Sequence, residues 1–171
     1  TLRGVGVSVP GLVNERLQEV VFCPNLHLLD KHNPARDLAE RLGVQGVLLQ
    51  EMDALCLGER MYGDARGLDD FAMLDVATGL GLGVMSGGHL LSGHSGMAGE
   101  VGHITIQPDG IRCGCGNRGC LETLATDAAL VRMISEELGR SITVDEAAIL
   151  LREQPGDFQH HVRMVSEYLA I

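Results

Sequence analysis

The chain has 171 residues, 45% hydrophobic and only 3% aromatic, so it can bury an aliphatic core in one sizeable domain or two small lobes. Its formal net charge of −10 argues against a nucleic-acid surface, so DNA binding would need a domain absent from this chain. No apolar run reaches the roughly 18 residues of a membrane span, so we expect no membrane partner and a cytoplasmic location. The first residues resemble a strand and not a signal peptide, so we expect a piece of a longer protein.

The first part of the chain predicts an α/β lobe. Its apolar runs are short and end at turn residues such as Pro10-Gly11, which is typical of strands. Pro34 suits the first turn of a short helix, and Gly43 suits its end. A strand pair followed by a strand–helix alternation is typical of α/β folds. The expected elements are strands over Arg3–Val9, Leu17–Cys23 (the return strand of a hairpin) and Val47–Gln50, and helices over Pro34–Leu42 and Ala54–Tyr62.

A polar stretch over Asp64–Asp70 predicts a boundary between two lobes, residues 1–66 and residues 67–171. Glycines cluster between Gly79 and Gly102, which favours tight turns and close backbone approaches over helices. The strands expected after the boundary cover Phe71–Val76, Leu82–Met85 and His103–Ile106.

The last part of the chain predicts three helices. We expect Asp127 to cap the first of them and Gly139 to close it. We expect Thr143 to cap the second in a capping box with Glu146. The expected helices cover Ala128–Leu138, Val144–Arg152 and Asp157–Ala170.

One short segment carries four side chains that favour zinc. Three thiolates and one imidazole make a closed tetrahedral ligand set, which is typical of structural Zn²⁺. The ligands are His103, Cys113, Cys115 and Cys120. A disulfide between neighbours as close as Cys113 and Cys115 would be strained, and the intervening glycines allow sharp turns. The alternative is that these are unrelated residues of one loop. The other two cysteines, Cys23 and Cys56, lie in apolar runs and are expected to be buried.

Two motifs surround these ligands. The first is Ala98-Gly99-Glu100-Val101-Gly102-His103, and the second runs from Cys113-Gly-Cys-Gly-Asn-Arg-Gly-Cys120 to Leu-Glu122. At this spacing they resemble both signatures of the ROK family, which groups sugar-responsive repressors, open reading frames and sugar kinases. The family's opening Asp-x-Gly-Gly-Thr strand and its closing segment would lie outside this chain. Shorter stretches extend the resemblance over essentially the whole chain: Ser8–Val13, Pro24–Leu26, Glu51–Ala54 and Thr78–Gly83.

The resemblance implies an actin-like, ribonuclease-H-type α/β fold with two lobes, a zinc loop over residues 103–122, and a sugar in the cleft. It implies sugar contacts from Gly11, Asn25, Asp53, Glu100, His103 and Glu122. Carboxylates accept hydrogen bonds from adjacent hydroxyls, and His103 would bind zinc through one ring nitrogen and sugar through the other. Taken without the family, Asp53 can be a helix cap, Glu100 a solvated loop charge and Glu122 a favourable first-turn acid.

The resemblance leaves two activities open. In the kinases of the family, the residue at Asp53 is the general base that activates a sugar hydroxyl toward ATP–Mg²⁺. The second phosphate loop would then include Thr78, Gly79 and Gly81. However, Met52 stands where the kinases usually have Asn, and an alanine replaces the first glycine of the loop. Both departures favour a sensor that binds sugar without phosphorylating it.

We therefore expect the sugar-binding effector domain of a ROK-type transcriptional repressor, resembling the NagC/XylR-like regulators. An ATP-dependent hexose kinase is the first alternative, and a degenerate dimerisation scaffold that binds no sugar is the second. Members of the family are commonly dimers or tetramers, so a homo-oligomer is expected. The sugar and any operator DNA are not specified by the sequence.

Overall fold

The computed structural model describes residues 1–14, 16–24, 26–154 and 156–170. The chain forms two compact units, one made of Thr1–Met73 with Leu82–Gly99, the other of Leu74–Gly81 with Glu100–Ile171. Each unit combines two separate stretches of the chain, so the units are not the two predicted lobes. The lobe boundary between residues 66 and 67 stays a prediction. Among the described helices, none has the length and apolar content that crossing a membrane requires.

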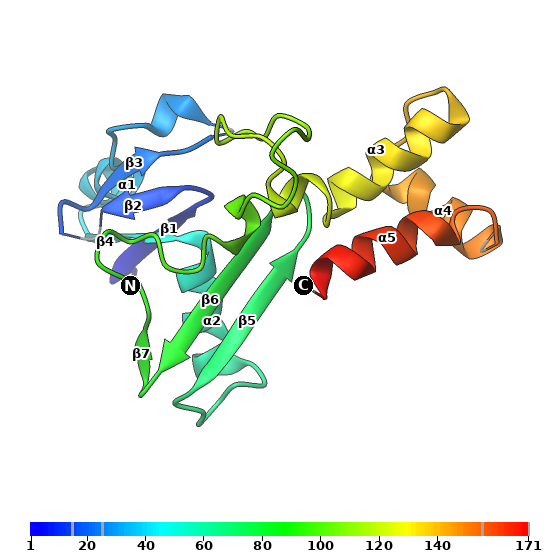
Figure 1. Cartoon of the computed structure of the whole chain (residues 1–171). Helices are drawn as coiled ribbons and strands as arrows, with labels where there is room; N and C mark the ends of the chain where they lie inside the picture. Colours follow the sequence, from blue (N-terminus) through cyan, green and yellow to red (C-terminus); the bar gives the residue numbers. More distant parts are fainter. Residues whose placement is uncertain (15, 25, 155, 171) are drawn as a thin grey trace. The chain divides into compact units, whose positions relative to one another are not determined.

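Short strands and two helices build the first unit (Figure 1). Strands β1 and β4 pair in parallel, whereas β2 and β3 pair antiparallel. Strand β6 pairs antiparallel with β7, in a sheet whose order is β5-β6-β7. The elements are β1 (Gly4–Val9), β2 (Leu12–Asn14), β3 (Glu19–Phe22), the 3₁₀ turn η1 (His27–Leu29), α1 (Pro34–Leu42), β4 (Gln45–Gln50), α2 (Glu51–Tyr62) and β7 (His89–Leu90). Strands β5 (Phe71–Val76) and β6 (Leu80–Ser86) each belong partly to the first unit and partly to the second.

The strand predicted over Arg3–Val9 is confirmed as β1, but its expected hairpin partner is wrong. The return strand, β3, pairs with β2, and β1 instead pairs with β4. The Pro10-Gly11 turn separates β1 from β2, and the Gly11 N–H donates to the Val9 carbonyl at 3.0 Å. This tight turn ends β1 and starts a new strand at Leu12, which then forms the hairpin.

Helix α1 has the predicted bounds because its two ends carry strong local signals. The Asn33 side chain accepts a hydrogen bond from the Arg36 N–H, Pro34 occupies the first turn, and Gly43 adopts the left-handed conformation at φ 65°. Helix α2 begins at Glu51, three residues before the predicted start. Asp53 therefore lies inside its first turn and is not its cap residue.

The core of the first unit joins the hairpin, the parallel strand pair and α1. Its fully buried members include Val20, Cys23 and Leu48, and Ala35 of α1 packs with them. Cys23 and Cys56 are both buried, so the prediction that they act as hydrophobic residues is confirmed.

Helices and 3₁₀ turns make up most of the second unit. Its elements are η2 (Val101–His103), η3 (Leu121–Thr123), α3 (Asp127–Leu138), α4 (Val144–Glu153) and α5 (Gln159–Leu169). The three predicted helices are thus present, each shifted by two residues at most. Their shared core contains Ile134, Ile142, Ala147 and Phe158. The predicted capping box of Thr143 and Glu146 is present at the start of α4.

The strand predicted over His103–Ile106 is wrong. His103 ends the 3₁₀ turn η2, and Thr105 forms only an isolated bridge with Cys120. The backbone N–H groups of Ile106 and Gln107 both donate to the Gly119 carbonyl, at 2.8 and 3.1 Å. Two donors on one carbonyl break the regular ladder that a strand requires.

Helix α3 is capped by Thr126 and not by the predicted Asp127. The buried Thr126 hydroxyl accepts from the Ala129 N–H at 3.2 Å and donates to the Glu122 carbonyl at 2.8 Å. We therefore expect Thr126→Ala to lower the free energy of unfolding by about 1–2 kcal/mol. Asp127→Ala, which removes only a first-turn charge, should cost less than about 1 kcal/mol. Urea unfolding of both variants measures the difference, and an equal loss would contradict the assignment of the cap.

Candidate metal and sugar site

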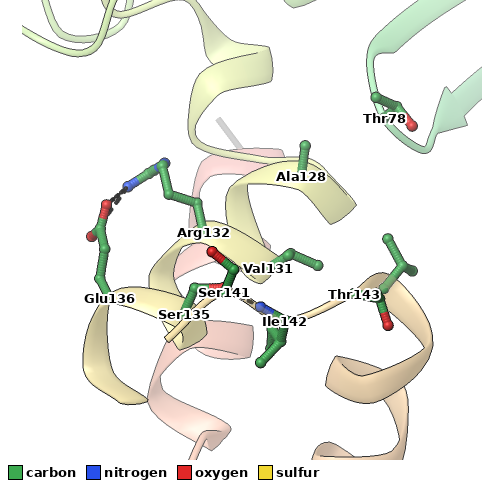
Figure 2. Close-up of a pocket in the computed structure, with 10 residues that line it drawn as sticks. Thr78, Ala128, Val131, Arg132, Ser135, Glu136, Ser141, Ile142 and Thr143 are labelled. Atoms are coloured by element: carbon green, nitrogen blue, oxygen red, sulfur yellow. Dashed lines mark hydrogen bonds and ion pairs between the residues drawn. The ribbon is translucent and has the colours of Figure 1, made fainter. Parts of the chain in front are cut away.

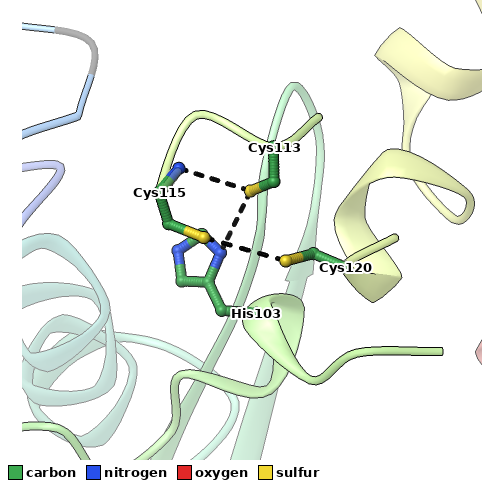
Figure 3. Close-up of side chains that lie close together, drawn as sticks. All are labelled: His103, Cys113, Cys115 and Cys120. Carbon is green, nitrogen blue, oxygen red and sulfur yellow. Dashed lines mark hydrogen bonds between the residues drawn. The ribbon is translucent and has the colours of Figure 1, made fainter. Parts of the chain in front are cut away.

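The four predicted zinc ligands converge on one point in the second unit (Figure 3). His103 comes from the end of η2, and Cys120 directly precedes η3. Cys113 and Cys115 lie on a tight turn, in which the Gly116 N–H donates to the Cys113 carbonyl at 3.0 Å. The turn is closed by a second bond, from the Cys113 N–H to the Asn117 carbonyl at 2.8 Å. Backbone hydrogen bonds therefore hold the thiol groups near the imidazole.

The distances fit a tetrahedral zinc ion. The Cys113 sulfur lies 3.6 Å from His103 Nδ1, and the sulfurs of Cys115 and Cys120 lie 3.7 Å apart. All four ligand atoms lie within 4.8 Å of one another. Bond lengths of about 2.3 Å for Zn–S and about 2.0 Å for Zn–N place tetrahedral ligands about 3.6–3.8 Å apart. The donor set and its spacing therefore fit a closed, structural Zn²⁺ site.

The thiols of this cluster have unequal acidities. Burial raises the pKa of Cys113, and its hydrogen bond to Glu122 raises it further. Burial likewise raises the pKa of Cys120. Burial also acts to raise the pKa of Cys115. Hydrogen bonds from the Asn117 N–H and the neighbouring thiols stabilise the Cys115 thiolate more strongly, so the pKa of Cys115 is lowered. A metal ion would supply the positive charge that stabilises all three thiolates together.

Two carboxylates flank the His103 ring. Glu122 Oε1 lies 3.5 Å from Nδ1, and Glu100 Oε2 lies 3.6 Å from Nε2. The same Glu122 oxygen accepts a hydrogen bond from the Cys113 thiol at 2.8 Å. Nδ1 faces the thiols, so it is the nitrogen placed for metal, whereas Nε2 lies on the side of Glu100. Three residues of this unit were predicted to contact sugar, and they lie together: Glu100, His103 and Glu122.

The other residues predicted to contact sugar belong to the first unit or lie outside the described residues. Asp53, in the first turn of α2, and Gly11 both belong to the first unit. A Cβ at Gly11 would lie 2.5 Å from the Phe22 carbonyl oxygen, so packing against β3 already requires glycine at this position. Asn25 lies outside the described residues.

The predicted phosphate loop forms the turn between β5 and β6. A Cβ at Gly79 would lie 3.6 Å from Glu122 Oε2, so this turn lies beside the cluster around His103. Thr78 also lines a pocket of about 520 Å³ together with α3 and the start of α4 (Figure 2). Arg132 and Thr143 contribute polar groups to it. Gly81 is the second residue of β6. The sequence offered no motif that marked Arg132 as a pocket residue.

The chain thus combines an α/β fold, a cysteine-rich loop and a glycine turn that lies beside clustered carboxylates. A model of the ROK family matches residues 1–171. A glucokinase of Thermotoga maritima is 40% identical over 77% of this chain and 42% of its own length, and a xylose repressor of Bacillus subtilis is 38% identical over 78% and 34%. The crystal structure of a Streptomyces griseus ROK-family glucokinase with glucose and AMPPNP shares 32% identity, with a TM-score of 0.74 over 98% of this chain and 54% of that one.

The chain therefore belongs to the ROK family, and the predicted fold class is confirmed. It spans less than half the length of either curated relative. Both regulators and kinases are among its relatives, so family membership is compatible with either activity.

Proposed function

We propose that this chain is the sugar-binding effector part of a ROK-family repressor, stabilised by a zinc ion on His103, Cys113, Cys115 and Cys120. The observation that carries the proposal is the pair of carboxylates, Glu100 and Glu122, on either side of the His103 ring. In this arrangement one ring nitrogen faces the metal ligands and the other lies beside a carboxylate. Metal ligation would fix the orientation and the tautomer of the imidazole, so that Nε2 could serve a sugar hydroxyl.

Zinc binding would also change what Glu122 can accept. Glu122 Oε1 accepts a hydrogen bond from the Cys113 thiol at 2.8 Å. Ligation requires a thiolate, which has no proton to donate. The carboxylate would then need another donor, and a sugar hydroxyl is a suitable one. Metal binding and sugar binding would therefore be coupled through Glu122. Asp53, Gly11 and Asn25 are proposed to complete the sugar contacts by the family resemblance.

Substitution of Glu122 tests the sugar site. We expect Glu122→Gln to weaken binding of the cognate sugar by about tenfold to a hundredfold, because a hydrogen bond to a charged group contributes about 1.5–3 kcal/mol. Isothermal titration of the full-length, zinc-loaded protein with glucose, xylose, N-acetylglucosamine, mannose and fructose identifies the sugar and measures the loss. Glu153→Gln, an exposed carboxylate at the end of α4, is the matched control. Unchanged affinity at full zinc content would contradict the proposed role of Glu122.

A sugar kinase is the second candidate function. The pocket beside Thr78 favours it, since a kinase needs room for a nucleotide next to its phosphate loop. Met52 and the altered glycine loop favour the repressor, because a thioether cannot donate the hydrogen bonds of the amide usual in the kinases. An ATP-dependent phosphorylation assay of the full-length protein separates the two. Turnover that Asp53→Asn abolishes would establish a kinase, whereas sugar binding without turnover would support the sensor.

The proposed partners follow from the same assignment. The ligand would be a small sugar, and DNA would be bound only through a domain outside this chain. A homo-oligomer is proposed because members of the family are commonly dimers or tetramers. A bound sugar at about 100 times its Kd should raise the free energy of unfolding by about 2.7 kcal/mol. If no sugar in the panel changes the thermal stability, the chain is a scaffold that binds no sugar.

A further inference from the structure

A second cluster of metal-binding side chains lies between α3 and α5, apart in sequence from the cysteine loop. It consists of Glu137 near the end of α3 and of His160 and His161 in the first turn of α5. Glu137 Oε2 lies 2.6 Å from Nε2 of His161 and 3.2 Å from Nε2 of His160. The two imidazole rings lie close together, with centroids 3.9 Å apart. All three ligand atoms lie within 4.8 Å of one another.

We propose that Glu137, His160 and His161 form a second, surface-accessible site for a divalent transition metal such as Zn²⁺, Ni²⁺ or Cu²⁺. Two imidazoles and one carboxylate are a borderline ligand set that suits these ions and not Mg²⁺ or Ca²⁺. Three protein ligands leave at least one coordination position open, unlike the closed set of the cysteine loop. The inference concerns metal binding alone and does not depend on the proposed sugar site.

The spacing requires only a small adjustment to hold an ion. With metal–ligand bonds of about 2.1 Å, tetrahedral ligand atoms lie about 3.4 Å apart. The contact of 3.2 Å between Glu137 and His160 already meets this spacing, whereas the contact of 2.6 Å to His161 must open by less than about 1 Å. The Glu137 side chain is 43% exposed, so its carboxylate has room to move.

The three residues differ in burial, so one side of the site is buried and the other borders solvent. His161 is buried, with 9% of the residue exposed, whereas the side chain of His160 is 56% exposed. Phe158, just before the two histidines, packs in one core with Ile134 of α3. That core packs the start of α5 against α3, so the backbone keeps the two histidines near Glu137. His160 and Glu137 border solvent, from which an ion can enter.

The competing interpretation is a purely structural ion pair. Glu137 places negative charge at the start of α5, where the helix dipole favours an anion, and the residue at the cap position, Phe158, makes no side-chain cap hydrogen bond. Such a pair would need only one histidine. The presence of both Nε2 atoms near the same carboxylate oxygen is what favours a chelating site. His161 Nδ1 is buried and has no hydrogen-bond partner among the described residues, so Nε2, which faces Glu137, is the nitrogen that would bind the ion.

The test is a metal titration of the full chain, free of any polyhistidine tag, with the cysteine loop already loaded with zinc. Isothermal titration with Ni²⁺ at neutral pH should detect one additional equivalent. His160→Gln should weaken this binding by at least about tenfold, since loss of even a supporting ligand contact costs that much. His94→Gln, which removes an exposed loop histidine, should leave it unchanged. Thermal unfolding checks that each variant is folded.

Cobalt distinguishes the two sites by their spectra. Cobalt in the cysteine loop should give a strong thiolate-to-metal charge-transfer band, whereas cobalt at Glu137, His160 and His161 should give only weak ligand-field absorption. With the loop blocked by zinc, we expect the weak bands alone, and we expect Glu137→Gln to diminish them. Absence of a second equivalent, or Ni²⁺ affinity equal in His160→Gln and the parent protein, would overturn the proposal and leave the structural ion pair.

Discussion

Replacement of Cys120 by serine is expected to release the zinc ion and to destabilise the second unit. Cys120 is fully buried, and its sulfur lies 3.7 Å from that of Cys115. Serine has no thiolate, so the four-ligand site would lose one of its ligands and most of its affinity for zinc. We expect zinc to fall from about one equivalent per chain to a trace. The free energy of unfolding should fall by at least about 3 kcal/mol, because loss of a structural metal is among the largest single-residue effects.

The measurement combines elemental analysis of protein purified without chelators and thermal unfolding. A loss of about 3 kcal/mol corresponds to a fall in Tm of roughly 6–12 °C for a chain of this size. Cys23→Ala is the matched control, because Cys23 is equally buried but lies in the core of the first unit. It should keep the full zinc content. Equal zinc content in Cys120→Ser and Cys23→Ala would contradict the metal assignment.

Elements with strong local signals were predictable from the sequence. Helix α1 has Asn33, Pro34 and Gly43 at its ends, and the structure uses each in the expected way. Helix α4 carries its capping box within four consecutive residues, so no distant contact is needed to define its start. In both helices the decisive hydrogen bonds connect residues three apart, and sequence patterns record such pairs directly.

Features set by distant contacts were not predictable. The partner of β1 is β4, which lies about forty residues away, and no local pattern distinguishes it from the nearby hairpin strand. The cap of α3 was not predictable for a local reason, because Thr126 and Asp127 both suit the pattern of a cap residue. The structure uses Thr126, whose hydroxyl also donates to the Glu122 carbonyl four residues earlier. Thr105 forms a bridge with Cys120, and the next two N–H groups both donate to the Gly119 carbonyl, so these contacts between residues far apart in sequence prevent a regular strand.

The candidate metal sites also differ in how far the sequence predicts them. The four predicted zinc ligands and Glu122 lie in one short segment, so their residue types and spacing predicted the cluster. Glu137 and the two histidines are more than twenty residues apart in sequence and carry no motif. The shared core that contains Ile134 and Phe158 packs α5 against α3 and brings that second cluster together. Close packing on β3 also explains Gly11 without a ligand, so its contact with sugar stays a prediction.

Replacement of Gly119 by alanine is expected to disrupt the metal loop from its backbone. Gly119 adopts φ +62°, and a Cβ there would lie 1.5 Å from the Gln107 carbonyl oxygen. The Gln107 backbone cannot easily retreat, because its N–H donates to the Gly119 carbonyl and its own carbonyl accepts from Gly110. We expect Gly119→Ala to lower the free energy of unfolding by about 3 kcal/mol or more. Zinc affinity should fall as well, because Cys120 is the next residue.

Gly116→Ala is the matched control within the same loop. Gly116 also has a positive φ, +95°, but a Cβ there would meet no atom within 4 Å. It should therefore cost only the conformational strain of about 1–2 kcal/mol and keep its zinc. Urea unfolding and competition for zinc with a chromophoric chelator measure both effects. Equal losses in the two variants would mean that backbone conformation alone governs this loop, and that the close approach of Gly119 to Gln107 does not hold the ligands in place.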